Sequence, residues 1–176
     1  MELPVVPSEQ TEPAGPWYAA GLKFTCSQCG NCCTGGPGYV WVSPEEIDRL
    51  AEFLKISPQQ TVERYCRKIG ERLSFKEKRG PGGFDCVFLT DSQTAPSKGG
   101  VPLKRKGCSI YPVRPLQCRT WPFWPENLSG PAQWERAAVR CHGMNHGRRQ
   151  FSLPQIESLR DAQDWPDNPP TSAKRG

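Results

Sequence analysis

The residues best suited to chemistry in this sequence are cysteines, and four of them fall within eight positions. The run reads Cys26-Ser-Gln-Cys29-Gly-Asn-Cys32-Cys33. A Cys-x-x-Cys turn places two thiolates where one tetrahedral metal ion can bind both, at about 2.3 Å. The third cysteine at this spacing extends the series to Cys-x-x-Cys-x-x-Cys, which also begins bacterial iron–sulfur sequences. The run therefore predicts bound zinc or iron, with a 4Fe-4S cluster as one form of the iron.

Cys33 departs from the ferredoxin spacing because it follows Cys32 directly. Adjacent side chains diverge, so these two thiols are expected to face different ions or different corners of one cluster. A second set of cysteines is spread over the C-terminal half of the chain. Its members are Cys86, Cys108, Cys118 and Cys141. The two sets supply eight thiols, enough for two four-coordinate sites or one larger cluster, and their spacing leaves the division open.

The other sulfur and imidazole side chains are predicted to lie outside the metal centre. Cys66 falls on an expected apolar helix face with no partner cysteine nearby, which is typical of a core residue. His142 and His146 have the i, i+4 spacing that metal sites use. Two glycines, at 143 and 147, argue against a regular helix there. We expect both histidines at the surface, with His142 as a reserve ligand.

The expected cellular compartment favours metal ligands over disulfides. Residues 1–7 (Met-Glu-Leu-Pro-Val-Val-Pro) have no basic start, apolar stretch or cleavage site of a secretory signal. No stretch approaches the roughly 20 apolar residues that span a bilayer. The chain has nine cysteines, and an odd number suits a disulfide framework poorly. The sequence thus predicts a cytoplasmic protein with no membrane association, in which clustered cysteines are thiolate ligands.

Two motifs together resemble a known family. Phe24-x-Cys26-x-x-Cys29-Gly30-x-Cys32-Cys33 is similar to the signature of the YkgJ-type CxxCxxCC cysteine-cluster family of zinc- or iron-chelating domain proteins. The downstream motif is Cys108-Ser-Ile110-Tyr111-x-x-Arg114-Pro115-x-x-Cys118-Arg119-x-x-Pro122-Phe123, and Cys86-x-Phe88-Leu89 and Cys141-x-Gly143 resemble the two remaining cysteine positions. The match covers roughly residues 22–145. It implies bound zinc or iron in a metal-chelating, structural or electron-transfer role.

Two other functions stay open as alternatives. A flagellin lysine N-methylase shares a related cysteine pattern, so the resemblance also implies an iron–sulfur enzyme that acts on a protein or a small molecule. A zinc-stabilised nucleic-acid-binding module is the third hypothesis, because the net charge is +5 and basic runs are present. That charge falls to about +1 once eight thiolates and two divalent ions are counted. Metal ions are therefore the expected partners, and nucleic acid is not.

Charged and aromatic residues flank the second cysteine set. Arg114 and Arg119 could bind an anionic group, but we expect them to offset thiolate charge and orient the loop around the ligands. Tyr111 is predicted to be a half-buried packing residue. The aromatic side chains just after Cys118 are predicted to form a hydrophobic lid that excludes water from the metal. They are Trp121, Phe123 and Trp124.

The elements that would position these residues are short. Ser43-Pro-Glu-Glu and Ser57-Pro-Gln-Gln each combine an N-cap serine, proline at the first helical position and an acid or amide at N3. They predict two helices after the first cysteine run. The second helix is expected to bury Val62, Tyr65, Cys66 and Ile69 on one face. A further helix is predicted over 153–162, whereas residues 134–139 fit helix and strand equally.

Strands are predicted over 39–42 and 83–90, a weaker one over 71–79, and a hairpin arm over 101–106. The fold class predicted is α+β, a small, loop-rich domain stapled by metal, with two short helices and a short antiparallel sheet. Abundant Pro and Gly and only 36% hydrophobic residues agree with that. The predicted boundaries are a flexible segment at 1–20, the cysteine-cluster domain at 21–163 and a disordered tail at 164–176.

Overall fold

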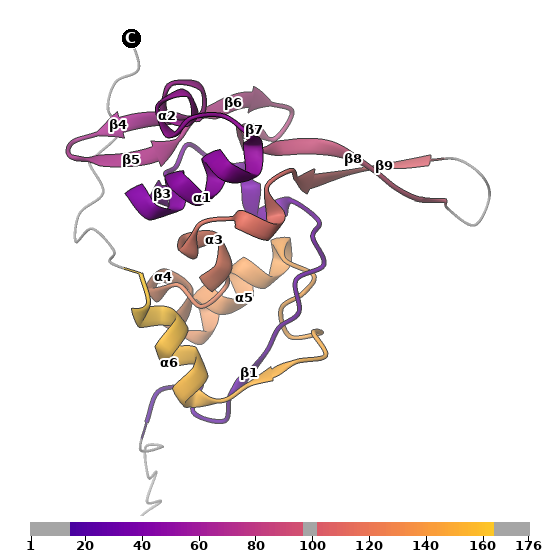
Figure 1. The fold of residues 1–176 in the computed structure, drawn as a ribbon. Coiled ribbons are helices and arrows are strands. Elements are labelled where there is room, and N and C mark those ends of the chain that lie inside the picture. Colours follow the sequence, from indigo (N-terminus) through magenta and orange to yellow (C-terminus); the bar gives the residue numbers. More distant parts are fainter. Residues whose placement is uncertain (1–14, 97–101, 164–176) are drawn as a thin grey trace, which may run out of the picture.

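The protein mixes helices with small antiparallel sheets, as the predicted α+β class requires (Figure 1). The structure is a computed structural model and describes residues 15–96 and 102–163. The predicted tail at 164–176 and most of the predicted flexible segment, residues 1–14, lie outside the described residues. Within the described ranges no helix is long and apolar enough to cross a membrane.

Two helices follow the first cysteine run and begin where the sequence predicted. Helix α1 spans Pro44–Leu54 and α2 spans Pro58–Tyr65, each with a capping box. At α1 the Ser43 Oγ accepts from the Glu46 amide at 3.3 Å, and a Glu46 carboxylate oxygen accepts from the Ser43 amide at 3.1 Å. Both capping boxes satisfy backbone N–H groups that the first turn of a helix leaves without partners. The start of each helix is therefore determined by a few neighbouring residues.

The second helix ends earlier than predicted. Residues Cys66–Ile69 form strand β4, which pairs antiparallel with β5 (Arg72–Phe75) through a turn at Gly70, where φ is 56°. The prediction that Cys66 and Ile69 continue the helical face was therefore wrong. Cys66 is nevertheless buried, opposite Phe75 in the ladder. Strand β3 (Trp41–Val42) lies on the other side of β5.

The remaining predicted strands form two further sheets. The 71–79 and 83–90 segments each contain a break, because they contribute to separate strands. The three-stranded sheet has the order β2 (Thr34–Gly35), β7 (Gly83–Cys86), β6 (Glu77–Gly80). Strands β8 (Leu89–Pro96) and β9 (Pro102–Cys108) form the predicted hairpin, which projects from the body in Figure 1. A small ladder joins β1 (Leu22–Lys23) to β10 (Gln150–Phe151).

The described chain after the β8–β9 hairpin is mostly helical. Its helices are α3 (Leu116–Thr120), α4 (Pro125–Leu128), α5 (Pro131–Arg140) and α6 (Leu153–Asp161). Residues 134–139, which fitted helix and strand equally in the sequence, lie in helix α5. Trp134 points from this helix into the core and is 1% exposed. Helix α6 begins at Leu153, as predicted, after a capping box on Ser152. Two short 3₁₀ helices, η1 (Asn31–Cys33) and η2 (Tyr111–Val113), lie at the two cysteine motifs.

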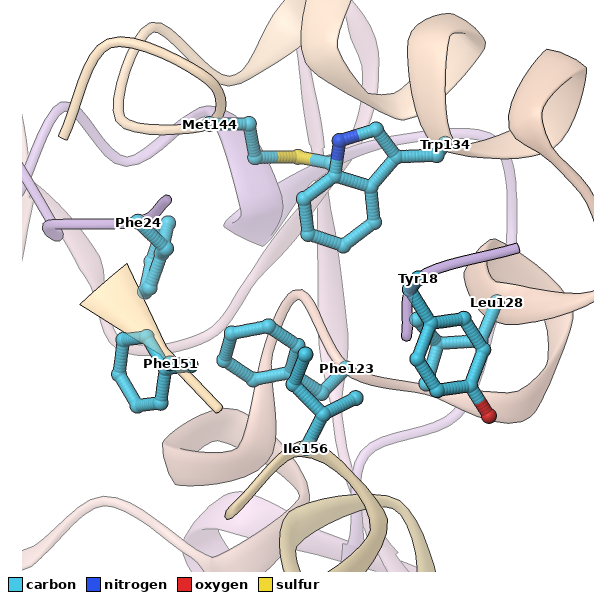
Figure 2. Close-up of a cluster of buried hydrophobic side chains, with 8 residues drawn as sticks. All are labelled: Tyr18, Phe24, Phe123, Leu128, Trp134, Met144, Phe151 and Ile156. Carbon is cyan, nitrogen blue, oxygen red and sulfur yellow. The ribbon is translucent and has the colours of Figure 1, made fainter. Parts of the chain in front are cut away.

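Two hydrophobic cores flank the cysteines. The first joins the N-terminal segment to the C-terminal helices through Tyr18, Phe24, Phe123, Leu128, Trp134, Met144, Phe151 and Ile156 (Figure 2). The second lies between α1, α2 and the sheets and contains Val42, Ile47, Leu50, Cys66, Phe75, Phe88 and Ile110. Cys141 packs against the first core, whereas Cys86 and Cys108 pack against the second. The cysteine region therefore occupies the junction between the two cores.

Candidate metal centre

The structure brings the predicted ligand cysteines together. A cavity of about 70 Å³ is lined by seven of them: Cys26, Cys29, Cys32, Cys33, Cys108, Cys118 and Cys141. Cys86 lies at an adjoining hollow that also contacts Cys32 and Cys33. Thiols from both halves of the sequence thus surround one space, and Cys66 is set apart in the second core, as predicted.

The thiols line the wall of a space and do not converge on one point. Within 15–96 and 102–163, no group of three or more His, Cys, Asp or Glu side chains already stands as the ligands of a single metal ion. Cys32 Sγ and Cys33 Sγ are 3.9 Å apart. His142 and His146 are exposed and do not line the cavity, so the structure places both at the surface.

A glycine turn positions the first cysteine run. Gly30 has φ 74°, in the left-handed region, and its carbonyl accepts from the Cys33 amide at 2.9 Å. A Cβ at Gly30 would lie 2.7 Å from Leu89 Cδ1 and 3.3 Å from the Lys106 carbonyl oxygen. The position thus excludes a side chain on two grounds, backbone conformation and close packing against the β8–β9 hairpin. This turn holds η1 against the β8–β9 hairpin, whose strand β9 carries Cys108.

The loop after α5 brings Cys141 to the N-terminal cysteines. The Thr25 amide donates to the Gly143 carbonyl at 3.0 Å, and the Asn145 amide donates to the Lys23 carbonyl at 3.0 Å. A Cβ at Gly147 would overlap the backbone of Phe24 and Thr25. The backbone of this loop therefore lies directly on the segment that precedes Cys26. As a result, position 147 has room only for glycine.

Gly147→Ala is expected to push this loop away from Phe24 and Thr25. We expect it to destabilise the fold by about 1–3 kcal/mol, the usual cost of overpacking a tight contact. The measurement is chemical denaturation of the metal-loaded protein, together with its metal content. Gly36→Ala is the matched control, because nothing lies within 4 Å of a Cβ at Gly36. Equal stability of the two variants would contradict this account of the loop.

Two further sets of hydrogen bonds, which no sequence motif predicts, hold the elements around the cavity in place. The buried Gln117, next to Cys118 on α3, accepts from the Trp41 amide at 2.7 Å and donates to the Tyr39 carbonyl at 3.0 Å. On the opposite side, the Asn31 side chain donates to the Arg140 carbonyl at 2.9 Å. These residues tie α3 to β3 and η1 to α5. No spacing or motif marks either contact, since each joins residues more than 70 positions apart.

The three aromatic residues of the predicted lid lie in different places, and Phe123 does not lie at the cavity. Trp121 lines the cavity, and its indole N–H donates to Cys141 Sγ at 3.5 Å. Phe123 is instead 1% exposed within the first core, where it stacks on Trp134. The peptide bond between Trp121 and Pro122 is cis. Trp124 lies at the hollow beside Cys86 and donates its indole N–H to the Gln117 carbonyl at 2.9 Å.

Both predicted arginines line the cavity, in different environments. The Arg114 guanidinium carbon lies 3.7 Å from the ring centroid of Tyr111, and the buried Nε of Arg114 has no hydrogen-bond partner among the described residues. Tyr111 is half-buried at the same wall, as predicted. Arg119 is exposed and lies 3.9 Å from Glu46 Oε1. Arg114 is therefore the cation placed among the thiols, and Arg119 lies at the rim.

Burial raises the pKa of three of these thiols, those of Cys86, Cys108 and Cys118. Loss of water raises the pKa of Cys86 to about 11 and holds the pKa of Cys118 well above its usual value, with neighbouring thiolates adding to both effects. Cys32 differs, because its hydrogen bond with Cys33 lowers the pKa of Cys32 to about 7 and raises that of Cys33. A metal ion must displace protons from these sulfurs before it binds.

Metal affinity is therefore expected to rise with pH. Thiols with raised pKa values are protonated at neutral pH, so each displaced proton strengthens apparent binding about tenfold per pH unit until the pH passes the thiol pKa. Chelator competition at pH 6.5, 7.5 and 8.5, with calorimetry in buffers of different ionisation enthalpy, would measure the protons released. An affinity that stays constant over this range would contradict the burial of neutral thiols.

Comparison with known proteins places the chain in a family. The sequence model of the CxxCxxCC family, described as "Putative zinc- or iron-chelating domain", matches residues 25–142. A relative, the protein MJ0661 of Methanocaldococcus jannaschii, is 31% identical over 106 residues, which are 60% of this chain and 48% of that protein. The chain thus spans about half the length of this relative. No solved structure matches the chain. Because the matched residues include all eight of these cysteines and more than half of the chain, this protein belongs to the CxxCxxCC family.

Proposed function

We propose that this protein binds a polynuclear iron–sulfur centre through its eight clustered cysteines and exchanges electrons through that centre. The observation that carries the proposal is the cavity lined by seven thiols with the eighth beside it. Cysteine thiolates are the usual ligands of iron–sulfur clusters. The proposed ligands are Cys26, Cys29, Cys32, Cys33, Cys86, Cys108, Cys118 and Cys141.

The size and charge of the cavity support a centre with more than one metal ion. A cavity needs about 10–15 Å³ to hold one water molecule. The cavity of about 70 Å³ has room for several groups of that size. Arg114 lines the cavity and brings a positive charge to it, and its buried Nε is a donor with no partner among the described residues, so it is available to a sulfur ligand. Such donors stabilise thiolate ligands and tune the potential of a cluster.

The exposure of the ligands supports electron transfer. Cys26 and Cys32 are exposed, whereas Cys118 is only partly exposed and its sulfur lies deep. A centre bound by all of them would have one edge at the protein surface and the rest inside the protein. Such an edge would let a redox partner approach closely, and solvent exposure is one of the factors that set a cluster potential.

Zinc in a structural role is the second candidate, and one distance favours it. The 3.9 Å between Cys32 Sγ and Cys33 Sγ is close to the sulfur–sulfur spacing that a tetrahedral ion with bonds of about 2.3 Å requires. Eight thiolates would then hold two zinc ions, each with four sulfur ligands. In that role the metal would stabilise the junction of the two cores without changing oxidation state.

Purification without oxygen, followed by analysis of metal and acid-labile sulfide, separates the two candidates. The iron–sulfur proposal predicts iron and sulfide in similar amounts, and broad visible absorbance that bleaches on reduction. A colourless protein with about two zinc ions and no sulfide would overturn that proposal in favour of structural zinc. Neither metal at stoichiometric level would contradict both.

A further inference from the structure

A groove beside the cysteine cavity is a candidate binding site. It encloses about 530 Å³ and runs between the first cysteine run and helices α4 and α5. Three residues line both the groove and the cavity: Cys32, Trp121 and Cys141. We call this feature the α4–α5 groove. A molecule in it would lie against the wall of the proposed metal centre.

The walls of the α4–α5 groove carry cationic groups from α5. Arg136 lines it and makes no hydrogen bond or ion pair within the part of the chain that the structure describes. Arg140 also lines it, and its guanidinium donates to the Thr34 carbonyl at 2.7 Å. A Cβ at Gly35 would lie 2.9 Å from the Arg140 Nη1, so this guanidinium lies flat against the backbone of β2. One arginine is thus fixed in place, and the other is free to reach a ligand.

We propose that the α4–α5 groove binds a small organic anion, with a carboxylate or phosphate group held by Arg136 and Arg140. Guanidinium groups present paired N–H donors that match both of these anions. The volume lies within the range of about 300–1,000 Å³ usual for small-molecule sites. Glu126 lines the same groove and favours a ligand that also carries a hydroxyl or amino donor. The remainder of the ligand lies against Trp121.

The part of this proposal that places the ligand next to a metal centre rests on the proposed function. The binding of an anion by Arg136 and Arg140 does not depend on it. A ligand on the Trp121 wall contacts the residue that donates to Cys141 Sγ. Occupancy of the groove is therefore expected to change the visible spectrum of the metal-loaded protein. The same groove gives a reacting molecule access to the centre, a requirement that a purely structural metal would not have.

Calorimetric titration of the metal-loaded protein with acetate, citrate, pyrophosphate and adenosine monophosphate tests the proposal. We expect at least one of these anions to bind, and Arg136→Gln to weaken that binding about tenfold or more, as the loss of a charge-assisted hydrogen bond predicts. Arg64→Gln is the matched control, an exposed arginine on α2 that does not line the groove. Thermal unfolding checks that both variants keep the wild-type fold.

Two results would overturn the proposal: no anion of the four binds, or the wild-type protein and both variants bind equally. The spectrum gives a second readout, since the bound anion should shift the absorbance of the wild-type protein and not that of Arg136→Gln at the same concentration. Absence of zinc and iron from the wild-type protein would contradict the proposed metal centre. The comparison of the two arginine variants would still decide whether the groove binds anions.

Discussion

Cys118→Ala is expected to abolish metal binding and to unfold the protein at 25 °C. Cys118 lies on α3 at the junction of the two cores, and burial holds its thiol neutral until metal binds. Structural metal sites contribute on the order of 10 kcal/mol of binding free energy to folding. Total stabilities of about 5–15 kcal/mol are usual for whole domains. Loss of the centre therefore removes most of the stability of a chain with only 36% hydrophobic residues.

The control is the same substitution at the cysteine outside the cavity. Cys66→Ala removes a buried thiol from the second core, where Cys66 is 5% exposed. It should cost about 1 kcal/mol and leave the metal content unchanged. Thermal unfolding with metal analysis of both variants measures the difference. If Cys118→Ala unfolds at the wild-type temperature after it has lost its metal, then metal binding and folding are not coupled in this protein.

Arg114→Gln is expected to weaken metal binding about 10- to 100-fold while the protein stays folded. The Arg114 guanidinium lines the cavity and stacks on Tyr111, and its buried Nε has no hydrogen-bond partner in the part of the chain that the structure describes. Loss of groups that support metal ligands usually costs this much affinity. Without the positive charge, an iron–sulfur centre should also become harder to reduce, so its potential should fall.

Arg119→Gln separates this effect from a general loss of charge. Arg119 lines the same cavity, but it is exposed and pairs weakly with Glu46 at 3.9 Å. Exposed pairs of this kind contribute about 0–1 kcal/mol, so metal affinity should change only a few-fold. Chelator competition and a redox titration on both variants provide the measurements. Equal losses in the two variants would mean that Arg114 acts only through long-range charge.

The sequence predicted the helix starts well because they depend on local contacts. The serines at 43 and 57 and their N3 partners satisfy their own backbone donors, so four residues determine each boundary. The end of α2 depends on pairing with β5, which lies farther along the chain. Cys66 and Ile69 are three positions apart, so they share one face of a helix but point to opposite faces of a strand, and the spacing wrongly favoured a helix. Only the ladder with Phe75 and Arg72 decides between them.

In the candidate site, too, local features could be predicted and contacts between distant residues could not. Residue type and spacing singled out eight cysteines, of which seven line the cavity and Cys86 lies at the adjoining hollow, because few residue types bind these metals. The roles of Phe123 and Gln117 could not be predicted in this way. Phe123 enters the first core, whereas Trp121 lines the cysteine cavity and Trp124 the adjoining hollow. Gln117 holds α3 against β3 through bonds that form only in the folded chain.

The central claim is that cysteine sulfurs alone bind a centre containing several metal ions. X-ray absorption spectroscopy of the protein purified without oxygen tests it most directly. The account predicts an inner shell of sulfur at about 2.3 Å and a second shell from a neighbouring metal ion. An inner shell that contains nitrogen or oxygen ligands, or a metal ion without a metal neighbour, would contradict it.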